Sequence, residues 1–295
     1  MNLEIDAKGL AEELIDEVKV KIERLSVLHK IVPGLAVVKV GNDPASEIYV
    51  NNKVKMSQSL GLHSFRIDLP ETIDQKTLLR KIQLLNHDPK IHGILVQLPL
   101  PAHIDPNIIL ESINPLKDVD GLHPLNMGKL LKNEESLVPC TPMGCLILLK
   151  RLVGDLSGSN VVVVGKSNLV GKPMAQMLVN ESCTVTICNS KTKDLSKITQ
   201  TADILIVAIG KPKIIRREHV KKGAIVIDVG INRIDGGKLV GDVDFEEVNK
   251  LAKFITPVPG GVGRMTIACL MYNTIRAVCF QKDINFDSMK HIYKQ

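Results

Sequence analysis

The feature that most constrains the fold is a series of short aliphatic runs in the second half of the chain. Residues 160–164 have the sequence Asn-Val-Val-Val-Val, and comparable runs follow at 184–188, 203–210 and 224–230. Short apolar runs bounded by turns are typical of strands that are buried on both faces. Because helical segments separate these runs, they predict an α/β domain built on a parallel sheet.

A glycine turn follows the first run, where residues 165–171 have the sequence Gly-Lys-Ser-Asn-Leu-Val-Gly. The spacing is G-x-S-x-x-x-G, which differs from the G-x-G-x-x-G of many dinucleotide-binding domains. A strand that leads through a glycine turn into a helix can hold a pyrophosphate, because free N–H groups and the helix dipole face the anion. The turn therefore predicts a nucleotide-binding sheet. The alternative is a turn that only packs a helix in some other α/β domain.

The residues after the second run favour NADP over NAD. In NAD-specific domains an acidic residue near the end of the second strand binds the ribose 2′-hydroxyl group. Residues 188–193, Cys-Asn-Ser-Lys-Thr-Lys, contain no acidic residue. Lys166 and Ser190 can hold a 2′-phosphate instead, so we expect NADP as the cofactor.

The first half of the chain predicts a second α/β unit. Leu10, Leu14, Val18, Ile22 and Leu25 recur every three or four residues, which is the pattern of an amphipathic helix. The segments beyond it alternate between strands and helices as β-α-β-α-β. The expected order is helix 7–30, strand 35–41, helix 46–60, strand 63–69, a helix opened by Asp74, and strand 93–98.

Tyr49 and Lys53 lie four residues apart in the second of these helices, so their side chains share one face. A phenol beside an amine can bind a flat substrate and transfer protons, and short-chain dehydrogenases use the same spacing. In those enzymes the glycine turn comes first, within the same domain. Here the pair precedes the turn at Gly165 and lies in a separate unit. The order of the motifs excludes that family and leaves ordinary packing on a surface helix as the alternative.

Polar residues near other expected element ends are further candidates. Gln97 ends a buried strand, and ligands of parallel sheets bind beyond the carboxyl ends of the strands. A glutamine bound only to loop backbone is the alternative. Asp118 and Asp120 precede Gly121 in a loop that a simple turn also explains. Thr141 is a suitable N-cap for a helix that begins at the following Pro and runs to about residue 153.

Composition excludes several classes of protein. The 295-residue chain is 44% hydrophobic and 24% charged, which is ordinary for a globular protein and long enough for two domains. Its 3% aromatic content, without Trp, suits the aliphatic core of a parallel sheet. The net charge of +6 is interspersed and forms no basic stripe with aromatic residues, so no nucleic acid is expected. The absence of a signal sequence or a long apolar run predicts no membrane partner.

Four of the six cysteines form two C-x4-C pairs, Cys140 with Cys145 and Cys183 with Cys188, which suggest a metal site. However, Cys183 and Cys188 flank a strand-like segment and therefore point along a strand instead of around an ion. We expect no metal, and we expect buried reduced thiols, which are typical of a cytoplasmic protein.

Seven segments, in the same order, resemble the bifunctional methylenetetrahydrofolate dehydrogenase/methenyltetrahydrofolate cyclohydrolase family. They are GNDPASEIYVNNK (41–53), GILVQLPLP (93–101), KDVDGLHPLN (117–126), PCTP (139–142), VGKSNLVGKP (164–173), GAIVIDVGIN (223–232) and TPVPGGVGRMT (256–266). The resemblance covers nearly the whole chain.

The resemblance implies a folate-binding catalytic domain at 1–141 and 273–295 and a Rossmann-like NADP-binding domain at 142–272, with the active site in the cleft between them. The final helix, from about Met265, is expected to return to the first domain. The implied reactions are NADP-dependent oxidation of 5,10-methylenetetrahydrofolate to the 5,10-methenyl cation, and hydrolysis of that cation to 10-formyltetrahydrofolate. A homodimer formed through the Rossmann-like domain is also implied.

The resemblance assigns roles to single residues. Lys53 matches the catalytic lysine that transfers protons, and Gln97 matches the residue that positions it. Tyr49 matches a platform for the folate ring, and Asp120 matches the acid that binds the pterin. Asp118 is assigned to the loop itself. The implied catalytic residues are Tyr49, Lys53, Gln97 and Asp120; the substrate-binding set adds Val96, Leu98, Pro259, Gly260, Gly261, Val262 and Gly263; the cofactor set is Thr141, Gly165, Lys166, Ser167, Ser190 and Ile231.

One departure from the family pattern is Arg264, where the family usually has Pro in PGGVGPMT. Pro favours the start of a helix, whereas Arg adds an N–H group and a long cation. That cation can contact a phosphate or the glutamate tail of folate, or it can face solvent.

Two rival functions are a dehydrogenase without cyclohydrolase activity and a non-catalytic NADP sensor. The presence of Lys53, Gln97 and Asp120 together opposes the first, and the pterin-binding acid opposes the second.

Overall fold

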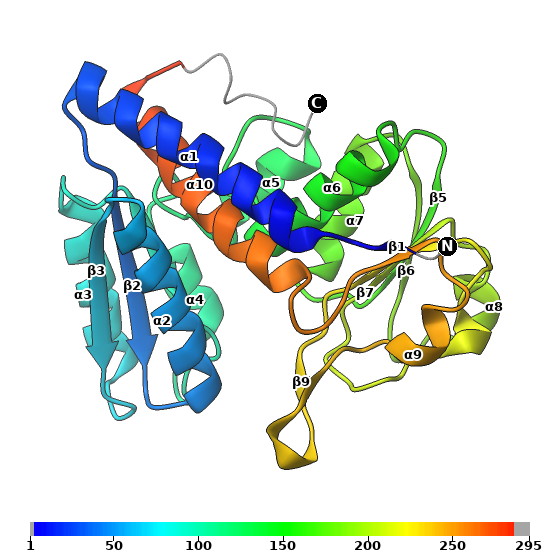
Figure 1. Cartoon of the computed structure of the whole chain (residues 1–295). Helices are drawn as coiled ribbons and strands as arrows, with labels where there is room; N and C mark the ends of the chain where they lie inside the picture. Colours follow the sequence, from blue (N-terminus) through cyan, green and yellow to red (C-terminus); the bar gives the residue numbers. More distant parts are fainter. Residues whose placement is uncertain (1–2, 286–295) are drawn as a thin grey trace. The chain divides into compact units, whose positions relative to one another are not determined.

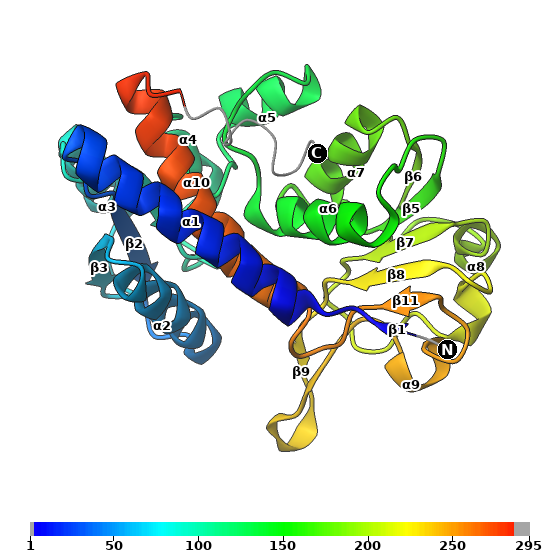
Figure 2. The same ribbon diagram turned by 45° about the horizontal axis from the view of Figure 1, so that its top comes forward.

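The computed structural model describes residues 3–285 and contains two compact units (Figures 1 and 2). Unit 1 comprises the described residues 3–12 and 141–266, and unit 2 comprises 13–140 and 267–285. These units differ from the predicted domain boundaries at residues 3–12, 141 and 267–272. The first difference arises because the strand at the beginning of the chain pairs within the sheet of unit 1.

Unit 2 is built on a three-stranded parallel sheet in the order β3-β2-β4, which confirms the predicted β-α-β-α-β arrangement. Every residue of the central strand β2 is buried, as expected for a strand with neighbours on both sides. Asp74 caps a helix as predicted, and its Oδ1 accepts a hydrogen bond from Thr77 N at 2.8 Å. The elements are β2 (Gly34–Val40), α2 (Pro44–Ser59), β3 (His63–Leu69), α3 (Gln75–His87), β4 (Gly93–Val96), α4 (Pro106–Glu111) and α5 (Pro124–Leu131).

The two faces of this sheet are covered by different helices. Side chains of β2 alternate between the faces, and Ala36 and Val38 pack into a core with Leu78 and Ile82 of α3 and with Ile109 of α4. The other face carries α2, and the sheet therefore has a helical layer on each side.

Two long helices also belong largely to unit 2, α1 (Ala7–His29) and α10 (Val262–Lys282). They lie side by side in both views (Figures 1 and 2). Lys21 of α1 and Cys279 of α10 are close enough to interact electrostatically. The return of the final helix to the first domain is thus confirmed, although the helix begins at Val262 and not at Met265.

Unit 1 is a six-stranded parallel sheet in the order β1-β11-β8-β7-β5-β6. This confirms the parallel α/β sheet predicted from the aliphatic runs. The strand order reverses at β5, which lies between β6 and β7, and ligands of such sheets bind at the carboxyl ends of the strands beside this reversal. The strands are β1 (Leu3–Glu4), β5 (Asn160–Val164), β6 (Thr184–Cys188), β7 (Ile204–Val207), β8 (Ile225–Asp228) and β11 (Phe254–Ile255).

Helices and a small hairpin complete unit 1. Val162, Leu205 and Val226 from three neighbouring strands form the centre of its core. The hairpin of β9 and β10 is antiparallel. The remaining elements are α6 (Cys140–Val153), α7 (Gly171–Asn180), α8 (Leu195–Thr199), β9 (Asn232–Arg233), β10 (Leu239–Val240) and α9 (Phe245–Val248), with short 3-10 helices at Arg217–His219 and Asp235–Gly237.

The six cysteines all fall within the described residues and are free thiols. Five are buried as predicted, whereas Cys183, at the beginning of β6, is half-buried. Within residues 3–285 no group of three or more His, Cys, Asp or Glu side chains is arranged to hold a metal ion. In the same part of the chain, none of the helices has the length and apolar composition needed to cross a membrane.

Candidate active site

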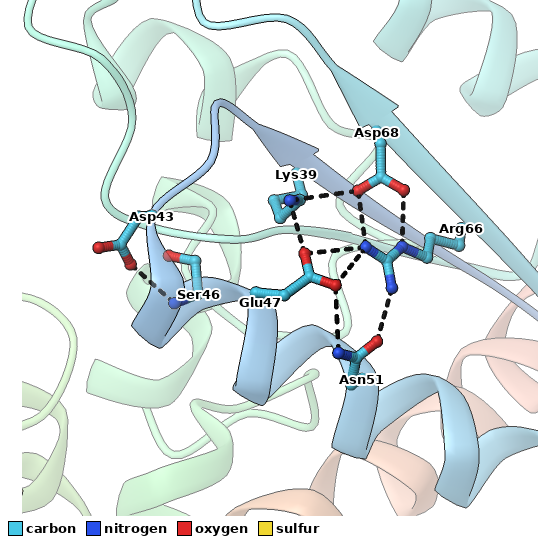
Figure 3. Close-up of polar contacts among 7 residues, drawn as sticks. All are labelled: Lys39, Asp43, Ser46, Glu47, Asn51, Arg66 and Asp68. Atoms are coloured by element: carbon cyan, nitrogen blue, oxygen red, sulfur yellow. Dashed lines mark hydrogen bonds and ion pairs between the residues drawn. The ribbon is translucent and has the colours of Figure 1, made fainter.

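The helix α2 carries two of the predicted site residues in unit 2. Asp43 caps it, since its Oδ2 accepts a hydrogen bond from Ser46 N at 2.7 Å (Figure 3). Tyr49 and Lys53 follow one turn apart on the same face. Tyr49 is 36% exposed, and partial burial raises the pKa of its hydroxyl group. Lys53 is half-buried. An accessible phenol ring therefore lies next to a partly desolvated amine.

Gln97 faces Lys53 from the end of β4. Its backbone N–H donates to Val38 O at 2.8 Å, which fixes it to the neighbouring strand. Its side-chain Nε2 donates to Leu98 O at 2.6 Å. That bond leaves Oε1 as the acceptor for Lys53 Nζ, at 3.0 Å. Lys53 is therefore bound to Gln97, and Gln97 binds more than loop backbone. Val96 is buried directly before it.

Asp120 contributes a carboxyl group to the same unit. Burial raises the pKa of Asp120, whereas the positive charge of Lys53 and a hydrogen bond with Cys140 lower it. Lys53 thus has an amide acceptor in contact and a carboxyl group within electrostatic range. Lys53, Gln97 and Asp120 are therefore brought together, with Tyr49 one turn away on α2.

The loop around Asp120 is fixed on both sides. Asp118 is buried, and its Oδ2 accepts hydrogen bonds from His123 N at 2.8 Å and Asn126 Nδ2 at 2.9 Å, in agreement with its assignment to the loop. Gly121 has a φ of +66°, and a Cβ there would lie 2.3 Å from the carbonyl carbon of Val138. Only glycine fits this close approach of two backbone segments.

The final helix also supports this loop. Asn273 of α10 donates from Nδ2 to Val119 O and to Val138 O, both at 2.8 Å. Val119 immediately precedes Asp120, so the buried amide holds the peptide from which the carboxyl side chain extends. No pattern in the sequence distinguished Asn273, because its partners are backbone atoms more than a hundred residues away.

The glycine turn of unit 1 leads from β5 into α7, beside the reversal of strand order. A Cβ on Gly165 would lie 2.2 Å from Ala208 O, and a Cβ on Gly171 would lie 2.0 Å from Gly165 O. Both positions require glycine, and the turn is a tight cradle of backbone at the helix N-terminus. Such a cradle fits a pyrophosphate group.

The polar side chains around this turn have different roles. Ser167 Oγ accepts a hydrogen bond from Val170 N at 3.1 Å and a longer one from Gly171 N at 3.4 Å, so it shapes the turn and retains its own O–H to donate. Lys166 is exposed on the turn. Ser190 is exposed in the loop after β6. The glycines, the hydroxyl groups and the cation suit a phosphorylated dinucleotide.

Thr141 does not cap α6, which is a correction to the prediction from sequence. The helix begins one residue earlier, at Cys140, so Thr141 lies within its first turn. Its Oγ1 instead forms a 3.0 Å hydrogen bond with Thr266 Oγ1. The capping rule located the beginning of the helix to within one residue, but it did not predict the hydrogen-bond partner of Thr141. That partner, Thr266, is the last residue of the 141–266 segment of unit 1.

The glycine loop before α10 has the close approaches that its sequence suggests. Gly260 has a φ of +109°, and a Cβ on Gly261 would lie 2.5 Å from Pro257 O. Val262 and Gly263 already belong to the helix, and Pro259 precedes them on the surface. A Cβ on Gly263 would lie 3.8 Å from Cδ1 of Ile231, which is itself 42% exposed. The residue Ile231 therefore lies against this loop.

Arg264 lies in the first turn of α10. Its backbone N–H donates to Gly261 O at 3.3 Å, a bond that proline could not make. Its side chain is exposed.

Two buried carboxyl groups in unit 1 were missed from the sequence. Asp242 accepts hydrogen bonds from the backbone N–H groups of residues 209–211 at 2.6–2.9 Å and so fixes the loop after β7. Asp228, at the end of β8, accepts from Gly230 N, Asp242 N and Val243 N. Burial raises the pKa of Asp228 to about 7, and the charge of Asp242 adds to the increase. The rule that identified Gln97, a polar residue at the end of a buried strand, also applies to Asp228.

Comparisons with known proteins identify the family of the chain. Residues 5–120 match the model of the tetrahydrofolate dehydrogenase/cyclohydrolase catalytic domain, and residues 139–282 match that of the NAD(P)-binding domain of the same family. The chain is 54% identical over 278 residues to bifunctional protein FolD 2 of Paracoccus denitrificans. The matched region covers 93% of this chain and 92% of the relative.

Solved structures give the same result. The bifunctional FolD methylenetetrahydrofolate dehydrogenase/cyclohydrolase of Campylobacter jejuni is 50% identical, with a TM-score of 0.93 over 95% of this chain and 100% of that one. The FolD of Trypanosoma brucei, determined in complex with NADP and an inhibitor, is 36% identical, with a TM-score of 0.91 over 97% and 99% of the two chains.

Proposed function

The chain belongs to the tetrahydrofolate dehydrogenase/cyclohydrolase family and is a bifunctional methylenetetrahydrofolate dehydrogenase/cyclohydrolase, and from this premise we propose that Lys53 transfers the protons of the hydrolytic step. The observation that supports this role is the 3.0 Å hydrogen bond from Lys53 Nζ to Gln97 Oε1, with the Asp120 carboxyl group within electrostatic range. We also propose that residues 1–141 and 273–295 bind folate and that 142–272 bind the dinucleotide.

Hydrolysis adds water to the 5,10-methenyl cation, breaks one carbon–nitrogen bond and releases one proton. Water loses one proton as its oxygen bonds to the methenyl carbon, and the resulting hydroxyl group loses a second proton to solvent as it becomes the formyl carbonyl. The departing ring nitrogen gains one proton. In its neutral form, the amine of Lys53 can accept the first proton from water, and as an ammonium group it can then donate that proton to the ring nitrogen. Gln97 occupies one N–H direction of that amine, which orients the remaining positions toward the substrate.

The other residues of unit 2 bind the substrate in this proposal. Tyr49 presents an exposed phenol face on which a flat ring can stack. Asp120 accepts hydrogen bonds from the amino and ring N–H groups of the pterin, and the cation of Lys53 favours its ionised form. Val96 and Leu98 flank Gln97 and supply apolar contacts.

A dinucleotide fits the turn of unit 1, and we propose that it is NADP. Bound NADP supplies the hydride acceptor for the oxidation. The backbone of residues 165–171 would bind its pyrophosphate, and Lys166 and Ser190 would bind the 2′-phosphate. Ile231 and Thr141 would border the nicotinamide end. Support comes from the cradle that only glycine permits and from the exposed cation beside it.

An absorbance assay with methylenetetrahydrofolate tests the role of Lys53. We expect Lys53→Ala to lose at least roughly 100-fold of its cyclohydrolase rate, since positioned acid–base groups contribute about that much or more. The dehydrogenase rate should fall less, because removing a hydride needs no proton from this lysine. Undiminished hydrolysis by the variant would refute the assignment.

Cofactor choice is tested by comparing kcat/KM for NADP and NAD. The wild type should prefer NADP, and Lys166→Ala should lose that preference mainly through a higher KM for NADP. A wild-type preference for NAD would contradict the proposal.

We further propose a cytoplasmic homodimer. The six free thiols favour a reducing compartment. The strand β6 ends the sheet of unit 1 with an exposed Ile187, and the nearby α7 carries an exposed Val179, which suits a protein contact at this edge. Light scattering after size-exclusion chromatography should give twice the mass of one chain, and a monomer would argue against the dimer.

A further inference from the structure

Five polar side chains connect α2 to the sheet of unit 2, and we call this group the α2 clamp. It consists of Lys39 on β2, Arg66 and Asp68 on β3, and Glu47 and Asn51 on α2 (Figure 3). Lys39 pairs with Asp68 in the strand register and Arg66 lies two residues before Asp68, so the three sheet residues share one face of two neighbouring strands. The two helix residues are one turn apart and meet them from above the sheet.

Glu47 is the centre of the clamp. Its Oε2 accepts from Lys39 Nζ at 2.6 Å and from an Arg66 amino group at 2.9 Å. Its Oε1 accepts from Arg66 at 2.7 Å and from Asn51 Nδ2 at 3.1 Å. Arg66 in turn donates to Asn51 Oδ1 at 2.6 Å and to both oxygens of Asp68 at 2.6 and 3.1 Å. One carboxylate therefore connects both strands to the helix.

Charge and burial make this arrangement specific. The side chain of Lys39 is only 7% exposed, and its ion pairs are with Glu47 and, at 3.6 Å, with Asp68. A buried ammonium group without a partner is strongly unfavourable. Hydrogen bonds from Lys39 and Arg66 lower the pKa of Glu47 to about 2, so its carboxylate is charged throughout the neutral range. The position of Glu47, and with it that of α2, is therefore tied to a buried cation.

The clamp and the catalytic pair occupy different faces of α2. Glu47 and Asn51 each precede a member of the pair, Tyr49 or Lys53, by two residues. Two residues correspond to a rotation of about 200° around a helix axis. The clamp therefore holds the face that is turned toward β2 and β3, and the opposite face presents Tyr49 and Lys53.

The strand β2 connects the clamp to the partner of Lys53. Gln97 is fixed by a backbone hydrogen bond to Val38 O, and Lys39 is the next residue of the same strand. Two successive residues of β2 thus position both ends of the Lys53–Gln97 hydrogen bond, one through Gln97 and the other through Glu47 and α2. A rotation or shift of α2 would change the distance from Nζ to Oε1.

We propose that the α2 clamp is a positioning device for Lys53, in which Glu47 sets the rotation and the axial position of α2 against β2. This inference rests on the proton-transfer role proposed for Lys53. Its residues do not contact the substrate; they act through the helix. The clamp should therefore affect hydrolysis, which depends on the placement of Nζ, more than hydride removal, which does not.

The test uses Glu47→Gln in the full-length enzyme and measures the ratio of cyclohydrolase to dehydrogenase kcat. The variant keeps the shape of the side chain but removes the charge that binds Lys39 and Arg66. A misplacement of about 1 Å can cost about 100-fold in rate, so a smaller shift should lower the ratio by roughly tenfold, with little change in the folate KM. A loss of folded protein would lower both rates equally and leave the ratio unchanged.

Three further variants complete the test. Glu181→Gln removes a comparable part-buried ion pair, Lys150 with Glu181 at 2.8 Å in unit 1, and should leave the ratio at the wild-type value. The double variant Lys39→Met with Glu47→Gln removes the buried charge together with its partner, so stability should recover while the ratio stays low. Lys53→Ala reports on the proposed function itself.

The outcomes separate the two proposals. If Lys53→Ala abolishes hydrolysis while Glu47→Gln keeps the wild-type ratio, the clamp has no positioning role. The clamp proposal would also be overturned if the double variant recovered the wild-type ratio, or if Glu181→Gln changed the ratio as much as Glu47→Gln does. Either result would mean that the change in the ratio comes from lost protein stability and not from the position of Lys53. Full hydrolysis by Lys53→Ala would overturn the role of Lys53 and with it the clamp.

Discussion

Replacing Gly171 with alanine tests the cradle at the start of α7. The new Cβ would lie 2.0 Å from Gly165 O, 2.5 Å from Gly165 C and 3.0 Å from Lys166 N. A carbon atom is essentially never found closer than 3.0 Å in such contacts, so the turn and the helix must separate by about 1 Å. All three neighbours are backbone atoms and cannot rotate away.

The cost follows from this overlap. Overpacking of a well-packed site costs about 1–3 kcal/mol, and the rigid neighbours place Gly171→Ala near the upper end. Alanine also reduces the conformational entropy of the unfolded chain, which offsets about 0.5–1 kcal/mol of this destabilisation. The net destabilisation is about 2 kcal/mol, which lowers Tm by roughly 4–8 °C for a protein of this size. The KM for NADP should also rise, because the N–H groups of the turn move apart.

Gly128→Ala is the matched control, since the chemical change is the same. Gly128 lies within α5, and a Cβ there would have no neighbour within 4 Å. Alanine in an open helical position should stabilise by about 0.5–1 kcal/mol. Thermal unfolding and dehydrogenase kinetics of the two variants give the comparison. Equal Tm and KM for Gly171→Ala and the wild type, or a similar loss in Gly128→Ala, would refute the steric argument.

Three other predictions concern the buried and paired carboxyl groups. Asp242→Ala removes the acceptor for three backbone N–H groups at 209–211 and should cost roughly 3–5 kcal/mol, with faster hydrogen exchange at those amides as the measure; unchanged exchange would contradict it. The pKa of Glu47 is lowered, so the ionised carboxylate stabilises the folded protein above its ordinary pKa of 4.5. This contribution to the free energy of unfolding is lost as the pH falls toward about 2. Urea midpoints should decline over this range in the wild type and less in Glu47→Gln, and parallel curves would count against the pairing. Asp228 has a raised pKa, so its contribution is greatest below pH 3.8 and is lost as the pH rises through about 7, by up to about 4 kcal/mol. Asp228→Asn should gain stability relative to the wild type across this interval, and a constant difference between their urea midpoints would disprove it.

Local sequence patterns predicted most of the fold. The strand at His63–Leu69 agrees with the prediction at both ends, and Asp74 caps its helix through Thr77 N. Both depend on residues within a few positions of each other. By contrast, β1 and β11 contain two residues each, and such short strands exist only through their neighbours in the sheet. No local pattern predicts them.

In the candidate site, too, local sequence patterns predicted some residues, whereas contacts between distant residues were not predicted. Gln97 was identified because a polar residue at the end of a buried strand is a local signal, and the same signal at Asp228 was overlooked. The clamp around Glu47 depends on the register that brings Lys39 beside Asp68, which the sequence does not specify. Thr141 shows the limit of the capping rule, since its partner Thr266 lies at the other end of unit 1.

The pairing of β1 with β11 has a consequence for synthesis of the chain. Leu3 and Glu4 leave the ribosome about 250 residues before their partners Phe254 and Ile255. At about 5–20 residues per second, that interval is roughly 10–50 s. The sheet of unit 2 can pair during this time, because its strands all lie within residues 34–96. The first strand of the chain is therefore the last to be incorporated, and its unpaired backbone waits for the residues that complete unit 1.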